Sequence, residues 1–199
     1  PVFAEGVQHA TAVKGTDKQS KMVICGVNSF NPTRENRMIV SQLSDAIEIT
    51  TLEIIREQMG STYSPSANVS CSILPRGIFE WQFYIECDPD NLKKIEDAII
   101  GILKDYQKNG PSAETLAKVQ EQMIVNRGSS MQNNYFWKNV IEASYQYDEN
   151  RDDDASIDDY AARVKKVTVK DIQKMAKEQV NLKNFVVVTL VPESEPAEE

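Results

Sequence analysis

One histidine, His9, is present among the 199 residues of the chain. Most catalytic triads use a histidine as the general base, and the only one here lies in a strand-like segment, so most histidine-based triads are excluded. In that setting we expect a structural or exposed imidazole rather than a metal ligand.

Cysteine is also scarce. Cys25, Cys71 and Cys87 are odd in number and have no Cys-x-x-Cys spacing, which excludes a complete intrachain disulfide framework and a strong zinc motif. All three lie in apolar, strand-like segments, so we expect buried free thiols rather than reactive ones.

Long apolar runs and excess positive charge are missing as well. No run approaches the roughly 20 residues that a membrane-spanning helix needs, so we expect no membrane insertion. The net charge of −8 argues against nucleic acid as a partner, because a nucleic-acid-binding surface needs a basic stripe. The acidic segment 151–159 lacks the central glycine and terminal glutamate of an EF-hand loop, and we interpret it as a solvated loop and helix start.

The N-terminus has neither an initiating methionine nor a basic region followed by an apolar one. We therefore expect the chain to be a C-terminal piece of a longer protein, and the missing targeting signal does not identify a compartment.

Apolar residues recur with strand and helix periods in a clear order. The pattern predicts strands over residues 7–14 and 21–30, a helix from about residue 31 to 59, a hairpin of strands 62–74 and 78–87, several helices between residues 88 and 180, and a strand over residues 185–191. Helices gathered on one face of a mostly antiparallel sheet, an α+β fold, suit this order best. We predict one α+β domain over residues 1–191 and an acidic disordered tail over residues 192–199.

Three details of the helical half can be predicted. Residues 127–130, with Gly128 among them, indicate a break or kink. The helix over residues 135–147 has an aromatic-rich face, which we interpret as core. Thr168 and Asp171 have the spacing of a capping box and open the last helix.

The long helix ends in a stretch that passes directly into a strand pattern. Met59 closes the helical period and Gly60 follows, the residue that adopts the left-handed cap conformation at least cost. Arg56 lies in the last helical turn, where a cation favours the negative end of the helix dipole. Tyr63 begins the strand pattern, so Arg56 and Tyr63 flank one tight turn and could point into a shared cleft. From their chemistry alone, the ordinary interpretation is that Arg56 is a surface residue and that Tyr63 packs in the protein interior.

The residues of this turn carry a resemblance to a known family. Their order resembles the Arg-Glu-x-Leu-Gly-x-x-Tyr signature of the pitrilysin/insulinase family of zinc metallopeptidases, with Met59 in place of the usual leucine: Arg56-Glu57-Gln58-Met59-Gly60-Ser61-Thr62-Tyr63. That swap should cost little, because the two side chains are similar in size. Pro65 is harder to place, since proline suits edge strands or bulges. Weaker similarities follow in order along nearly the whole chain, including Asn134-Tyr135-Phe136-Trp137.

The resemblance implies a half-domain of the pitrilysin, insulinase and mitochondrial-processing-peptidase type, from the half of the protein without the zinc motif. It implies that Arg56 and Tyr63 bind the substrate and the transition state, in trans to an upstream zinc-bearing domain across a closed chamber. The family's His-x-x-Glu-His motif cannot be present in a chain with one histidine, so we expect no metal site here, zinc in the full-length protein, and no peptide hydrolysis by this chain alone.

The implied partners are that upstream domain and a peptide substrate; homo-oligomerisation stays open. The resemblance also suggests a bacterial periplasm or cell envelope. The main alternative is a noncatalytic pseudo-peptidase domain that acts in assembly or peptide binding, and a third is an unrelated α+β binding module.

Overall fold

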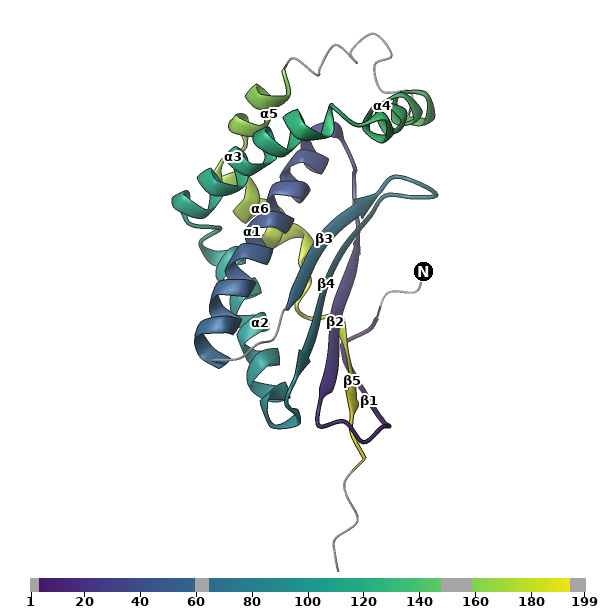
Figure 1. The fold of residues 1–199 in the computed structure, drawn as a ribbon, viewed down its shortest axis with the longest axis vertical. Helices are drawn as coiled ribbons and strands as arrows, with labels where there is room; N and C mark the ends of the chain where they lie inside the picture. Colours follow the sequence, from purple (N-terminus) through teal and green to yellow (C-terminus); the bar gives the residue numbers. More distant parts are fainter. Residues whose placement is uncertain (1–3, 60–64, 148–158, 194–199) are drawn as a thin grey trace, which may run out of the picture.

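The computed structural model of the chain describes residues 4–59, 65–147 and 159–193. Its elements follow the predicted order: β1 (Val7–Val13), β2 (Ser20–Ser29), α1 (Arg34–Met59), β3 (Ser66–Ser72), β4 (Ile78–Cys87), the 3-10 turn η1 (Pro89–Asn91), α2 (Leu92–Lys108), α3 (Ala113–Ser130), α4 (Asn134–Tyr147), α5 (Tyr160–Lys166), α6 (Val169–Gln179) and β5 (Phe185–Val191). Helices cover one face of a single sheet, which confirms the α+β prediction (Figure 1).

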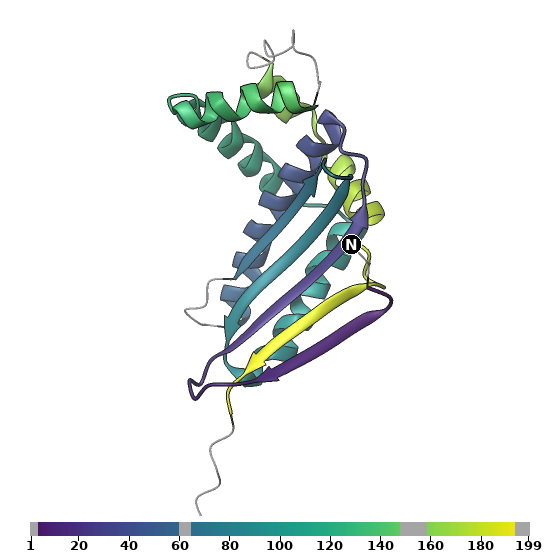
Figure 2. The ribbon, with the colours of Figure 1, turned by 90° about the vertical axis from the view of Figure 1, so that its right-hand side faces the viewer.

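The sheet has the order β1-β5-β2-β4-β3 (Figure 2). The last strand, β5, is inserted between the first two, parallel to β1 and antiparallel to β2. The pairs β2–β4 and β3–β4 are antiparallel. β1 and β3 are therefore the two edges of the sheet, and strands that are neighbours in sequence at the N-terminus do not pair with each other.

Helix α1 is long because its apolar residues keep one face over its whole length. Val40, Leu43, Ile47 and Ile55 are all buried, at spacings of three, four and eight that return to the same side of a helix. At its start, the Thr33 hydroxyl accepts a hydrogen bond from the Asn36 amide (3.2 Å), an N-cap that satisfies one of the exposed amides. α1 packs on α2, α3, α6 and β3.

Strand β4 shows the predicted alternation. The helix-facing side is buried throughout and is the centre of the core: Phe79, Trp81, Phe83, Ile85 and Cys87. On the opposite face the Tyr84 hydroxyl donates to Glu86 (2.6 Å), which also pairs with Lys21 on β2 (3.0 Å). Those two contacts lower the pKa of the Glu86 carboxyl.

One local prediction was displaced and one was wrong. The break predicted within residues 127–130 lies just after them, because α3 runs through Gly128 to Ser130 and α4 begins at Asn134, and no contact at Gly128 forces an earlier end. The aromatic face of α4 was interpreted as core, but Tyr135 is 73% exposed and no residue of α4 belongs to the hydrophobic core of the described residues.

The three cysteines are free; Cys87 is fully buried and the other two are half-buried. Burial raises the pKa of all three thiols, that of Cys87 to about 11.

Several sequence predictions fall partly or wholly outside the described residues. The strand predicted from residue 62 begins, in the described part, at Ser66. Most of the acidic segment 151–159 and residues 194–199 of the predicted tail are not described, while the Glu193 amide donates to the Gly15 carbonyl (2.8 Å). Among the described helices, none combines the length and apolar character needed to cross a membrane.

Candidate functional site

Arg56 lies in the last turn of α1 and is exposed, as its place in the helical pattern predicts. Its neighbour Ile55 is 1% exposed and anchors this end of the helix in the core. Tyr63 lies outside the described residues, so its position relative to Arg56 stays a prediction. The chain resumes at Pro65, which is buried and directly precedes β3. Because β3 is an edge strand, a proline at its start removes no ladder hydrogen bond from the sheet interior.

The middle of α1 is fixed by hydrogen bonds to its neighbours. The Tyr106 hydroxyl of α2 donates to the Ala46 carbonyl (2.7 Å) and lies 2.7 Å from Thr50 Oγ1. Tyr106 is almost fully buried, and burial raises its pKa to about 12. The amide of Val69 on β3 donates to Ser44 Oγ (2.9 Å). These bonds hold the helix that carries Arg56 against both α2 and the edge strand β3.

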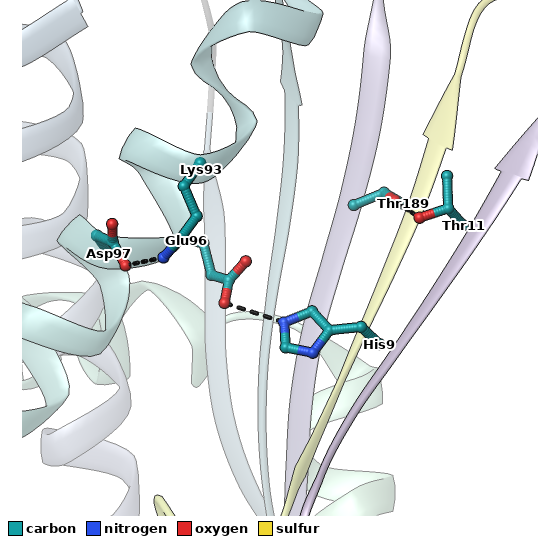
Figure 3. Close-up of polar contacts among 6 residues, drawn as sticks. All are labelled: His9, Thr11, Lys93, Glu96, Asp97 and Thr189. Carbon is teal, nitrogen blue, oxygen red and sulfur yellow. Dashed lines mark hydrogen bonds and ion pairs between the residues drawn. The ribbon is translucent and has the colours of Figure 1, made fainter.

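The only histidine is used in a contact between β1 and α2. His9 Nε2 lies 3.1 Å from Glu96 Oε1, and the His9 side chain is about half exposed (Figure 3). Next to it, the hydroxyls of Thr11 and Thr189 are 2.9 Å apart and join β1 to β5. This contact fits a structural imidazole at the sheet edge.

Zinc does not fit the side chains that the described part of the chain brings together. Within residues 4–59, 65–147 and 159–193, no three histidine, cysteine, aspartate or glutamate side chains lie close enough to hold a metal ion. A zinc site needs three or four such ligands around one ion.

A pocket of about 430 Å³ lies at the other end of α1. It is lined by Arg34, Glu35, Met38, Ile39, Asp159, Arg163, Lys166, Val167 and Asp171. Arg34 and Arg56 are 22 residues apart on one helix, or about 33 Å at 1.5 Å per residue. The pocket is therefore separate from the helix end that carries Arg56.

Comparison with known proteins identifies the family. A sequence profile described as the peptidase M16 inactive domain matches residues 3–123, more than half of the chain. The chain belongs to this family, which confirms the resemblance seen in the sequence. A search of curated proteins found no match.

Solved structures of peptidases share the fold. The periplasmic protease PqqL from Escherichia coli is 18% identical with a TM-score of 0.78, over 96% of this chain and 21% of that one. A peptidase M16 inactive domain from Pseudomonas fluorescens is 15% identical with a TM-score of 0.74, over 100% of this chain and 46% of that one. A putative zinc protease from Bordetella pertussis is 10% identical with a TM-score of 0.68, over 92% of this chain and 98% of that one. The chain thus spans about a fifth of the PqqL chain and under half of the Pseudomonas chain.

Sequence reasoning missed the exposed side of α4 and the residue that holds this helix, Arg127. The Arg127 guanidinium lies over the rings of Phe136 (4.3 Å to the centroid) and Tyr160 (4.6 Å), joining α3, α4 and α5. An arginine near the end of one predicted helix and an aromatic cluster in the next could have suggested this contact. The sequence does not show how the three helices cross, and their crossing decides whether the guanidinium reaches the rings.

Proposed function

We propose that this chain is the substrate-binding domain of a zinc-dependent metalloendopeptidase that hydrolyses peptides in a closed chamber. The observation that carries the proposal is that α1, in a chain of the M16 inactive-domain family, has an exposed arginine in its last turn, ten residues before the first residue of an edge strand. The zinc site would lie in an upstream domain, and the full-length protein would act in a bacterial periplasm or envelope, as PqqL is described to do.

Arg56 and Tyr63 have complementary chemistry for holding a peptide. The planar guanidinium of Arg56 can donate two parallel hydrogen bonds to a substrate carbonyl or carboxylate. The Tyr63 hydroxyl can donate to the carbonyl oxygen that gains negative charge in the transition state. β3 is an edge strand, and an edge strand can accept an extended peptide as a further strand at its free backbone groups, which exclude the Val69 amide because it donates to Ser44 Oγ.

The proposal assigns no step of bond cleavage to this chain alone. Its described residues bring together no group of three or more possible zinc ligands, so in this proposal the zinc is held by the other domain. The contribution of this chain is to orient the peptide and to stabilise developing charge.

Substitution of the two residues in the full-length protein tests these roles. Tyr63→Phe should lower kcat by about ten- to a thousandfold, the range for loss of one oxyanion donor, with zinc content unchanged.

Arg56→Gln should act mainly on KM, because Arg56 binds substrate and transition state alike. Tyr84→Phe and Arg76→Gln are the matched controls, since they make the same changes on the open sheet face and in the β3–β4 turn. Unchanged turnover in Tyr63→Phe would remove the proposed role of that hydroxyl.

Zinc content distinguishes the proposal from the alternative. About one zinc per full-length chain and none on the 199-residue chain would support a site divided between domains. If elemental analysis finds no zinc on either, a noncatalytic domain that acts in assembly or peptide binding becomes the better interpretation.

A further inference from the structure

Helix α4 stands apart from the core of the molecule. It follows the end of α3 at a large angle to it, beyond the end of the sheet and near the start of α1 (Figures 1 and 2). Phe136 and Val140 form its half-buried inner side, and Phe136 packs on the Arg127 guanidinium. The Trp137 indole donates to the Met131 carbonyl (2.8 Å). An isolated helix of 14 residues is marginal in water, so contacts of this helix matter for its stability.

The outer side of α4 is a seam of large exposed side chains. The seam consists of four residues at spacings of three, four and three, which place them on one stripe of the helix: Tyr135, Lys138, Glu142 and Tyr145. Tyr135 and Tyr145 are 73% and 67% exposed, and Ile141 beside them is 53% exposed. Lys138 and Glu142 pair with each other on the surface (3.1 Å). Tyrosine combines a large apolar area with a polar tip and is enriched where proteins meet.

The seam of one copy is complementary to the same seam of a second copy when the two helices run antiparallel. In two antiparallel copies related by a two-fold axis at the level of Val140, position i faces position 280 − i. Tyr135 then faces Tyr145 of the other copy at each end, and Lys138 faces Glu142 twice in the middle. Both contacts belong to an isologous interface, in which one surface patch meets itself. Both charged pairs are favourable in this arrangement and neither is left facing a like charge.

We propose that the outer seam of α4 binds the same seam of a second copy of this chain, forming a two-fold symmetric dimer. A second copy fits the seam because, in the antiparallel arrangement, each Lys138 faces a Glu142 and each Tyr135 faces a Tyr145. α4 is about 21 Å long, and two such helices bury less than the roughly 1,200 Å² of a stable interface. The dimer is therefore weak and depends on protein concentration.

Charge exchange on the seam tests the pairing directly. Sedimentation equilibrium of the chain over two decades of concentration should show a monomer–dimer equilibrium. Lys138→Glu places four acidic side chains at the centre of the interface, and Glu142→Lys places four basic ones there, so each variant should be monomeric. An equimolar mixture of the two variants should form a heterodimer, because each Glu of one then faces a Lys of the other. The double variant should dimerise again.

A matched control and an aromatic variant complete the test. Lys93→Glu makes the same charge change in the exposed Lys93–Asp97 pair of α2, and it should leave the dimer intact. Tyr135→Ala should weaken the dimer by about tenfold or more, as loss of an aromatic anchor does. Circular dichroism checks that each variant remains folded. A monomeric wild-type chain, a dimer that survives Lys138→Glu, or a mixture that forms no heterodimer would each overturn the proposal.

Discussion

At the scale of single residues, Gly26 permits the central packing of the sheet. It lies on β2 directly opposite Trp81 of β4, and a Cβ atom there would be 2.5 Å from the indole. The indole cannot move away easily, because it is 1% exposed and packs against Phe83 and Phe185 at centroid distances of 6.2 and 5.8 Å. The side chain missing at residue 26 is thus as important to the core as the large one at residue 81.

This contact gives a stability prediction with a built-in control. Gly26→Ala should lower the free energy of unfolding by about 1–3 kcal/mol, because the added methyl overpacks a core without free volume. Gly101→Ala, at an exposed position of α2 with no atom near the added methyl, should raise it by about 0.5–1 kcal/mol through helix propensity. Urea unfolding measures both. A neutral Gly26→Ala would show that the indole relocates.

Tyr106 gives a prediction about alkaline pH. Its pKa is raised to about 12 in the folded chain, against about 10 when unfolded, so the stability that the protonated phenol contributes is complete below pH 10 and is lost as pH rises to about 12. Near neutral pH, Tyr106→Phe should lower the free energy of unfolding by about 1 kcal/mol through the lost hydrogen bonds. Between pH 10 and 12 that difference should shrink, because phenylalanine does not ionise. A difference that is constant with pH in urea unfolding would contradict this explanation.

At the scale of elements, buried amides join three helices. Gln42 of α1 is fully buried and donates to the Val164 carbonyl (2.9 Å), and Gln120 of α3 donates to Gln42 (3.1 Å) and to the Val167 carbonyl (2.9 Å). These bonds satisfy the carbonyls at the end of α5, where the chain turns into α6. The turn itself is fixed by the capping box of Thr168 and Asp171, which was predicted from the sequence and is present.

The position of α4 depends on Arg127. Its guanidinium contacts Phe136 and Tyr160, and its Nε is buried without a hydrogen-bond partner among the described residues. Arg127→Met preserves length but removes the charge, which should cost about 0.5–2 kcal/mol per contact and speed amide hydrogen exchange in α4 by about tenfold.

Hydrogen exchange followed by mass spectrometry distinguishes local loosening of α4 in Arg127→Met from destabilisation of the whole fold. Amides of α2 should exchange as in the wild type, and Lys118→Met, on the exposed side of the same helix α3, should leave α4 unchanged. Equal acceleration in α2 and α4 would mean that Arg127 stabilises the whole fold and not α4 in particular.

At the scale of the whole molecule, α1 separates the two proposed surfaces. Its C-terminal end carries Arg56, and α4 lies near its N-terminal end, about 33 Å from Arg56 along the helix (Figure 1). Dimerisation through α4 would therefore leave the peptide-binding end accessible. The two proposals can fail independently, because the first depends on activity in the full-length protein and the second on association of this chain.

Local pattern predicted the elements well. The long helix α1, the alternating faces of β4 and the exposed end of α1 at Arg56 all follow from periods of 3.6 and 2 residues, which report the side that a residue must bury. The residue signature at the end of α1 indicated the family, and the profile match confirms that family. The role of Tyr63 stays a prediction.

Pairing over long distances could not be predicted in the same way. Nothing in the sequence of β5 indicates that it enters the sheet between β1 and β2, because its partners are more than 150 residues away and any apolar strand could fill that place. The contact of His9 with Glu96 of α2 depends on the same insertion, since the insertion makes β1 an edge strand separated from β2 by β5.

The sequence by itself determined the α+β class, the order of the elements and the family, because backbone preference and the burial of alternate residues act locally. Only the tertiary structure decided the strand order, the continuation of α3 through Gly128 and the exposure of the aromatic seam on α4. The pattern of an amphipathic aromatic helix is the same whether its face packs in a core or on another molecule. Which of the two occurs is decided by where the neighbouring helices end in space.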